Sequence, residues 1–236
     1  MGIFMKKSYK SVLLVTLLLL TACSSQKFFN IEPEGNDYDY YEGRKIETLT
    51  GDDIDASLNY EFQDNGNFVF YLYVANNSER NVLIDPDTFL SVNSTNRTDD
   101  RLVEAIDPEH QIERIKNDMS DLDDSHAASV GMNCLFATFN VVADIADGEE
   151  GDAVIDAGYW ASEIDDENKD YEYNTDRLKN DKLFWENEVL RITTLYPGEE
   201  TGGMVFFPIV PEAKKFKIVF EIEDVEFEFP FKQHIK

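Results

Sequence analysis

The C-terminal part of the chain alternates between apolar and polar side chains with a period of two, and this pattern constrains the fold more than any other feature. Two such runs flank a turn at Glu223-Asp224. Because successive side chains of a strand point to opposite faces, the spacing predicts a β-hairpin with one buried face. The residues predicted to be buried are Phe216, Ile218, Phe220 and Ile222 before the turn, and Val225, Phe227, Phe229 and Phe231 after it.

Further strands are predicted on both sides of the middle of the chain. Residues 58–62 alternate in polarity, residues 64–67 (DNGN) have the composition of a tight turn, and residues 68–75 (FVFYLYVA) are apolar on both faces, as in a central strand. Short apolar runs at 82–84, 89–92, 190–195 and 204–207 complete the set. About eight short strands separated by turns predict a β-sandwich.

The period changes to that of a helix between about residues 106 and 186. Asp107 is a good N-cap, Pro108 suits the first helical position, and Glu109 places an acid in the first turn. Apolar side chains then recur on one stripe at Ile112, Ile115, Met119 and Leu122. Residues 127–146 are apolar nearly all round, which predicts a helix buried against the sandwich; their polar interruptions and acidic flanks argue against a membrane span. We therefore expect a mainly β fold with an α-helical insertion.

The N-terminus has a different composition. Lys6, Lys7 and Lys10 precede an apolar run at residues 12–20, which is shorter than the roughly 20 residues that a membrane-spanning helix needs. Leu20-Thr21-Ala22-Cys23 follows directly. This arrangement resembles the lipobox of bacterial lipoproteins. The resemblance implies that residues 1–22 are a signal-peptide helix that is removed, and that Cys23 carries the lipid as the first residue of the mature chain.

The predicted signal peptide and lipidated Cys23 imply how the rest of the chain is organised. We expect a lipidated Cys and tether over residues 23–44 and a folded body over residues 45–236. The protein would then be held at the cell membrane or the outer membrane, exposed to the periplasm or the exterior. Residues 37–42 (DYDYYE) lie in the expected tether. They are interpreted as a solvated linker that partly docks on the body, with a ligand-binding patch as the alternative.

Several turn and strand motifs carry a second resemblance. Residues 74–78 (VANNS) precede Ile84-Asp85 and Phe89, and residues 195–199 (LYPGE) precede residues 203–207 (GMVFF). Over residues 45–105 and 188–231 the chain resembles the immunoglobulin-like extracellular domain of many bacterial lipoproteins. The resemblance implies an immunoglobulin-like β-sandwich interrupted by the helical insertion. Since these motifs belong to turns and core, they imply a fold and no particular activity.

The charge balance excludes one class of partner. The chain has 21 Lys and Arg residues against 48 Asp and Glu residues, a net charge of −27. Nucleic-acid binding requires a basic face that neutralises phosphates, so we expect no nucleic-acid partner.

The residues that could carry chemistry are few. The acidic clusters at 121–124, 149–152 and 165–167 contain Ca²⁺-type oxygen ligands, but none has the spacing of an EF-hand, and a solvated acidic face is the preferred interpretation. Cys134 is expected to be inert packing in an apolar helix. The three His residues lack metal-ligand spacing. Trp160 and Trp185 could stack on a sugar in a groove beside the insertion, but they are interpreted as anchors of the insertion.

These observations predict a membrane-anchored, non-catalytic binding or scaffolding module without a cofactor. Its partners would be the membrane, through the lipid on Cys23, and an envelope protein or glycan. Two alternatives stay open. One is an envelope hydrolase with an acidic site between sandwich and insertion, which requires a cleft holding a buried carboxyl group. The other is a Ca²⁺-dependent adhesion module.

Overall fold

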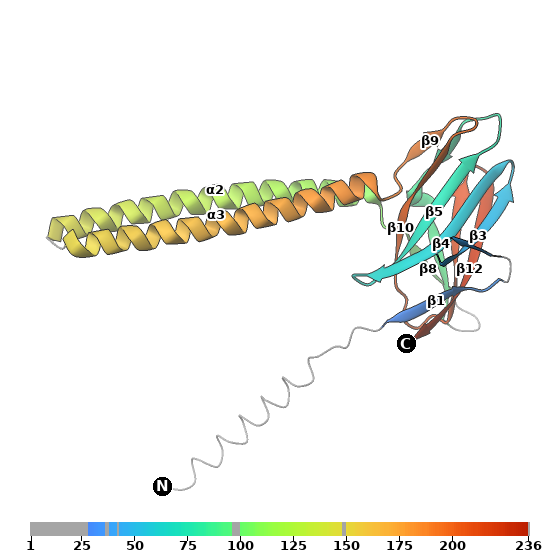
Figure 1. The fold of residues 1–236 in the computed structure, drawn as a ribbon, viewed down its shortest axis with the longest axis horizontal. Coiled ribbons are helices and arrows are strands. Elements are labelled where there is room, and N and C mark those ends of the chain that lie inside the picture. The colour runs from blue at the N-terminus through green and yellow to red at the C-terminus, as the bar shows by residue number, and fades with distance from the viewer. Residues whose placement is uncertain (1–27, 36–37, 42, 96–99, 148–149, 236) are drawn as a thin grey trace, which may run out of the picture.

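The computed structural model describes residues 28–35, 38–41, 43–95, 100–147 and 150–235. Between residues 136 and 161 it describes the backbone alone. Within this part of the chain, two antiparallel sheets pack face to face, and a long helical hairpin is inserted between two strands of the sandwich (Figure 1). The predicted mainly β fold with a helical insertion is confirmed. The expected signal-peptide helix at residues 1–22 and the lipidated Cys23 lie outside the described residues.

Each sheet has five strands. The first follows the order β1-β12-β11-β7-β8, and the second the order β10-β5-β4-β3-β2. The strands of the first sheet are β1 (Phe29–Pro33), β12 (Val225–Ile235), β11 (Lys215–Ile222), β7 (Leu90–Ser94) and β8 (Asp100–Glu104). Those of the second are β10 (Glu200–Pro208), β5 (Asn67–Asn76), β4 (Ile54–Asp64), β3 (Arg44–Gly51) and β2 (Asp39–Tyr41). The short strands β6 (Val82–Ile84) and β9 (Thr193–Leu195) pair with each other, and a 3-10 turn, η1 (Pro86–Thr88), follows β6.

The core lies between the sheets and is rich in phenylalanine. The β11–β12 hairpin contributes its predicted apolar face, and seven of the eight predicted side chains are buried, with Val225 partly buried. Phe70 of the opposite sheet contacts Phe231, with ring centroids 5.0 Å apart. The predicted turn at residues 64–67 is also confirmed. Asn65 and Gly66 both have positive φ, at 42° and 82°, as a two-residue hairpin turn requires.

The folded body begins earlier in the chain than residue 45. Phe29–Pro33 forms β1, which pairs antiparallel with β12, and Asp39–Tyr41 forms β2 at the edge of the second sheet. Part of the segment interpreted as a tether is therefore sheet. The alternation in β1 is short, with Phe29 and Ile31 the two buried side chains, and this is too little signal to separate a strand from a linker.

The insertion consists of two long helices, α2 (Pro108–Asp147) and α3 (Glu150–Asn187). At 40 residues and 1.5 Å per residue, α2 is about 60 Å long. The hairpin extends away from the sandwich (Figure 1). The prediction that residues 127–146 are buried against the sandwich is therefore wrong, and Met132 and Leu135 are exposed.

The two helices pack on each other along a coiled-coil seam. On α2 the less exposed positions follow the spacing of three and four residues that such a seam requires: Ile112, Ile115, Met119, Leu122, His126, Ser129 and Asn133. The seam is apolar near the sandwich and polar farther out. There the His126 ring stacks on Tyr171 at 4.0 Å, and Asn133 donates a hydrogen bond to Glu167. In the described part of the chain, neither helix is long and apolar enough to span a membrane.

Asn76 connects the two turn motifs noted in the sequence, residues 74–78 (VANNS) and residues 195–199 (LYPGE). It is fully buried at the end of β5. Its amide nitrogen donates to the carbonyl oxygens of Arg80 and Leu195, and its side-chain oxygen accepts from the backbone and hydroxyl of Ser78. The backbone of Asn76 also exchanges hydrogen bonds with Gly198 and Glu199. The VANNS and LYPGE segments are thus held against each other by one side chain and its backbone.

Candidate functional site

The outer face of the β10-β5-β4-β3-β2 sheet carries two cavities. One, which we call the hairpin-base cavity, lies where α2 and α3 leave the sandwich; the other, the tyrosine pocket, lies over β2, β3, β4 and β5. Val69 and Phe206 of this face pack with Trp185 and Phe184 and so attach the hairpin. Each cavity has a volume in the range of known ligand sites.

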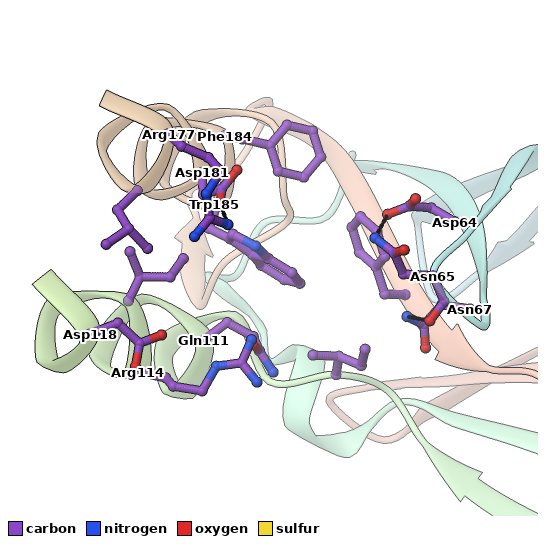
Figure 2. A pocket seen from close by; sticks show the side chains of 14 residues that line it. Asp64, Asn65, Asn67, Gln111, Arg114, Asp118, Arg177, Asp181, Phe184 and Trp185 are labelled. Atoms are coloured by element: carbon purple, nitrogen blue, oxygen red, sulfur yellow. Dashed lines mark hydrogen bonds and ion pairs between the residues drawn. The ribbon is translucent and has the colours of Figure 1, made fainter. Parts of the chain in front are cut away.

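The hairpin-base cavity has a volume of about 500 Å³. Figure 2 shows the bases of α2 and α3 on one side and the β4–β5 turn, with Asp64, Asn65 and Asn67, on the other. Trp185 lies against Phe206, with ring centroids 5.0 Å apart. The expectation that Trp185 anchors the insertion agrees with this contact, whereas the side chain of Trp160 lies outside the described residues.

A capped helix start and one ion pair hold the base of the hairpin. The Asp107 carboxylate accepts a hydrogen bond of 2.7 Å from the backbone of Glu109, as the predicted N-cap requires. The Glu109 carboxylate then accepts two bonds from the Arg191 guanidinium, 2.7 and 2.8 Å long. The bonds from Arg191 hold the pKa of Glu109 below its usual range. Since Arg191 follows α3, this pair joins the two ends of the insertion.

The hairpin-base cavity is the groove in which the hydrolase alternative requires a buried carboxyl group. Three acids line it, Asp64, Asp118 and Asp181, and all three are exposed. Asp181 faces Arg177 at 3.7 Å. None of these three lining acids is the buried carboxyl group that the hydrolase alternative requires.

The tyrosine pocket has a volume of about 560 Å³. Tyr71 and Tyr73 alternate with inward-facing residues on β5, so both rings point to the outer face, and Tyr41 approaches from the edge strand β2. Tyr41 and Tyr71 are exposed, at 65% and 37% of their surface. The remaining lining residues are Arg44, Ile46, Ser57, Asn59 and Glu61.

A charged pair forms the polar floor of this pocket. One Glu61 carboxylate oxygen accepts from Arg44 at 2.7 Å, and the other accepts from the side-chain amide of Asn59, also at 2.7 Å. The Glu61 side chain is only 10% exposed. It lies at a β-bulge, because β4 shifts its register against β5 between Tyr60 and Phe62. Ser57, Asn59 and Glu61 are alternate residues of β4 and so share its outer face.

One of the three tyrosines is held by a hydrogen bond. The Tyr73 hydroxyl donates to a carboxylate oxygen of Glu200 on the neighbouring strand, and this bond raises the pKa of Tyr73 to about 12. Tyr71 lies over Gly202 of β10. A Cβ atom at Gly202 would lie 2.9 Å from both the ring and the hydroxyl of Tyr71, so glycine leaves the space that the ring occupies.

Tyr71 and Tyr73 were not among the candidates predicted from the sequence, which assigned them to a central strand that is apolar on both faces. Their position on one face of the strand could have indicated a binding surface, since the alternate residues Phe70, Leu72 and Val74 are buried. Tyr41 belongs to the run for which a ligand-binding patch was an alternative. The structure places it in the pocket.

The other sequence candidates are not brought together. Asp123 accepts a hydrogen bond from Tyr171, and Asp165 and Asp166 pair with Lys169, so these acids make contacts on the hairpin. In the described residues no group of three His, Cys, Asp or Glu side chains could hold a metal ion. Cys134 is exposed, so its expected role as buried packing is wrong.

Comparison with known proteins adds no assignment: no family model, curated protein or solved structure matches this chain.

Proposed function

We propose that this protein is a lipid-anchored lipoprotein of the bacterial cell envelope, and that its sandwich is a non-catalytic binding module. The observation that carries the binding role is the tyrosine pocket. It is concave and lined by exposed aromatic rings; Gly202 leaves room for the Tyr71 ring, and Glu200 accepts a hydrogen bond from Tyr73. Its two charged groups, Arg44 and Glu61, pair with each other at 2.7 Å and can orient a ligand.

The anchor supports the same proposal by setting where binding takes place. The lipobox-like Leu20-Thr21-Ala22-Cys23 predicts lipid on Cys23, and β1 begins at Phe29, six residues later. A chain of six residues spans at most about 20 Å, however it is arranged. The sandwich would therefore stay close to the membrane surface, where its effective concentration towards envelope partners is high.

The helical hairpin supports a scaffolding role. Its helices of about 60 Å extend from a sandwich held within about 20 Å of the membrane, so the hairpin would reach partners well away from the anchor. The expected partners are an envelope protein or a glycan.

Crosslinking on native membranes tests the proposal. The full chain, tagged at its C-terminus, is compared with Cys23→Ala and Tyr71→Ala; Tyr196→Ala, at an exposed tyrosine after β9 that lies outside both the pocket and the hairpin, is the matched control. We expect neighbours with the wild type and with Tyr196→Ala, loss of the neighbours bound by the pocket with Tyr71→Ala, and release of Cys23→Ala from the membrane. The proposal would be contradicted if Cys23→Ala stayed on the membrane or if Tyr71→Ala recovered the same neighbours.

A further inference from the structure

The tyrosine pocket has walls and a floor of different chemistry, and together they restrict its ligand. The walls are the rings of Tyr41, Tyr71 and Tyr73. A tyrosine ring offers an apolar face for C–H groups, and its hydroxyl remains available for hydrogen bonding. A ligand that uses such walls has apolar faces and polar edges.

The floor supplies both donors and acceptors. Arg44 carries five N–H donors in a fixed plane, and its side chain is 46% exposed although one nitrogen bonds Glu61. Ser57 adds a hydroxyl, which already exchanges a hydrogen bond with Thr48 at 2.8 Å and can both donate and accept. A ligand that matches this floor carries groups that both donate and accept, and hydroxyl groups do so.

The charges of the pocket and of the chain disfavour anionic ligands. Glu61 and Arg44 cancel each other at 2.7 Å, so the floor has no net charge to neutralise. The net charge of −27 repels polyanions. An uncharged ligand matches this floor.

The pocket is also open along the sheet. Its lining comes from four neighbouring strands, β2 to β5, and strands lie about 4.8 Å apart. A chain of several units can lie across these strands, with one ring face on Tyr71 and another, farther along the chain, on Tyr41.

Resting on the proposed binding role, we propose that the tyrosine pocket binds an uncharged oligosaccharide, whose ring faces stack on Tyr71 and Tyr41 and whose hydroxyl groups bond Arg44 and Ser57.

Titration calorimetry on the full chain tests this, with chitotetraose, cellotetraose and maltotetraose as the uncharged probes. We expect at least one to bind, about tenfold more weakly to Tyr71→Ala and with little change to Tyr71→Phe, which keeps the ring. Tyr41→Ala, at an exposed edge strand, should also weaken binding and cannot disturb the core. Tyr196→Ala should bind as the wild type does.

The proposal is overturned if none of the three probes binds, or if Tyr71→Ala and Tyr41→Ala bind them as the wild type does. Crosslinked neighbours separate this failure from that of the binding role. If neighbours depend on Tyr71 while no oligosaccharide binds, the pocket takes a protein segment and the binding role stands. If neither depends on Tyr71, both proposals fail.

Discussion

Replacing Asn76 with alanine should destabilise the sandwich more than any other single amide substitution at its turns. The side chain is fully buried and makes four hydrogen bonds, which hold the segment after β5 and the segment after β9 in one arrangement. Alanine removes all four bonds. The Leu195 carbonyl oxygen, bonded in the buried interior, then loses this donor.

The loss of stability depends on whether the groups that lose their hydrogen bond to Asn76 can bond to water instead. A buried group left without a partner costs about 1–3 kcal/mol, and a bond whose partner can be hydrated costs about 0.5–1.5 kcal/mol. The Leu195 carbonyl belongs to the first kind, and the groups of Ser78 and Arg80, which are partly exposed, belong to the second. We expect a loss of about 3 kcal/mol, which for a domain of this size lowers Tm by about 6–12 °C.

Urea unfolding followed by far-UV circular dichroism measures this, with Asn77→Ala as the matched control. Asn77 is the next residue, and its side-chain amide bonds Asp55 at the surface, so its loss should cost less than about 0.5 kcal/mol. Asn76→Asp should be at least as unstable as Asn76→Ala at pH 7, since a carboxylate would face two carbonyl oxygens. Equal stabilities for Asn76→Ala and Asn77→Ala would refute the reasoning.

Three further predictions concern the insertion and its attachment. Gly203→Ala should lower the free energy of unfolding in urea by at least about 2 kcal/mol, because the added Cβ would lie 2.6 Å from the Leu190 backbone nitrogen. Gly131→Ala, in an open part of α2, should instead stabilise the protein by about 0.5–1 kcal/mol. If the two variants had similar stabilities, the close approach at Gly203 would be contradicted. Trp185→Ala should cost about 2–3 kcal/mol while the far-UV helix signal is kept, because the variant removes the contact with Phe206 and leaves the packing of α2 on α3; loss of the helix signal would contradict this, since the helices would then depend on that contact. Arg191→Met should cost less than about 1 kcal/mol at pH 7, since the side chains of Arg191 and Glu109 are each 40% exposed. Because Arg191 lowers the pKa of Glu109 from 4.5, the ion pair stabilises the protein above pH 4.5. The difference in stability between the variant and the wild type should therefore shrink as the pH falls below 4.5.

The sequence predicted the parts of the fold that local pattern controls. The β11–β12 hairpin, the Asn65-Gly66 turn and the Asp107 cap follow from period and turn chemistry within a few residues, and the structure has all three. β8 (Asp100–Glu104) was missed, because four of its five residues are charged or exposed and it forms only at a sheet edge.

The arrangement of the hairpin could not be predicted in the same way. The apolar stretch at residues 127–146 indicated burial, but period alone cannot distinguish a helix that packs on a sheet from one that packs on another helix. The alternation of three and four residues from Ile112 to Asn133 was the available signal for a coiled coil.

The tyrosine pocket depended on pairing between distant segments. Tyr41 and Tyr71 line one pocket because β2, β3, β4 and β5 are neighbours in one sheet. A sequence shows that tyrosines occur in two strands. Register across the sheet decides that they face one cavity.

The proposed membrane location depends most on Cys23 being the lipidated first residue of the mature chain. The intact mass of the protein extracted from bacterial membranes tests this directly. We predict a chain that begins at Cys23 and carries the added mass of a diacylglyceryl group, which Cys23→Ala lacks. A membrane-extracted chain that begins elsewhere, or that begins at Cys23 without added lipid mass, would contradict the account.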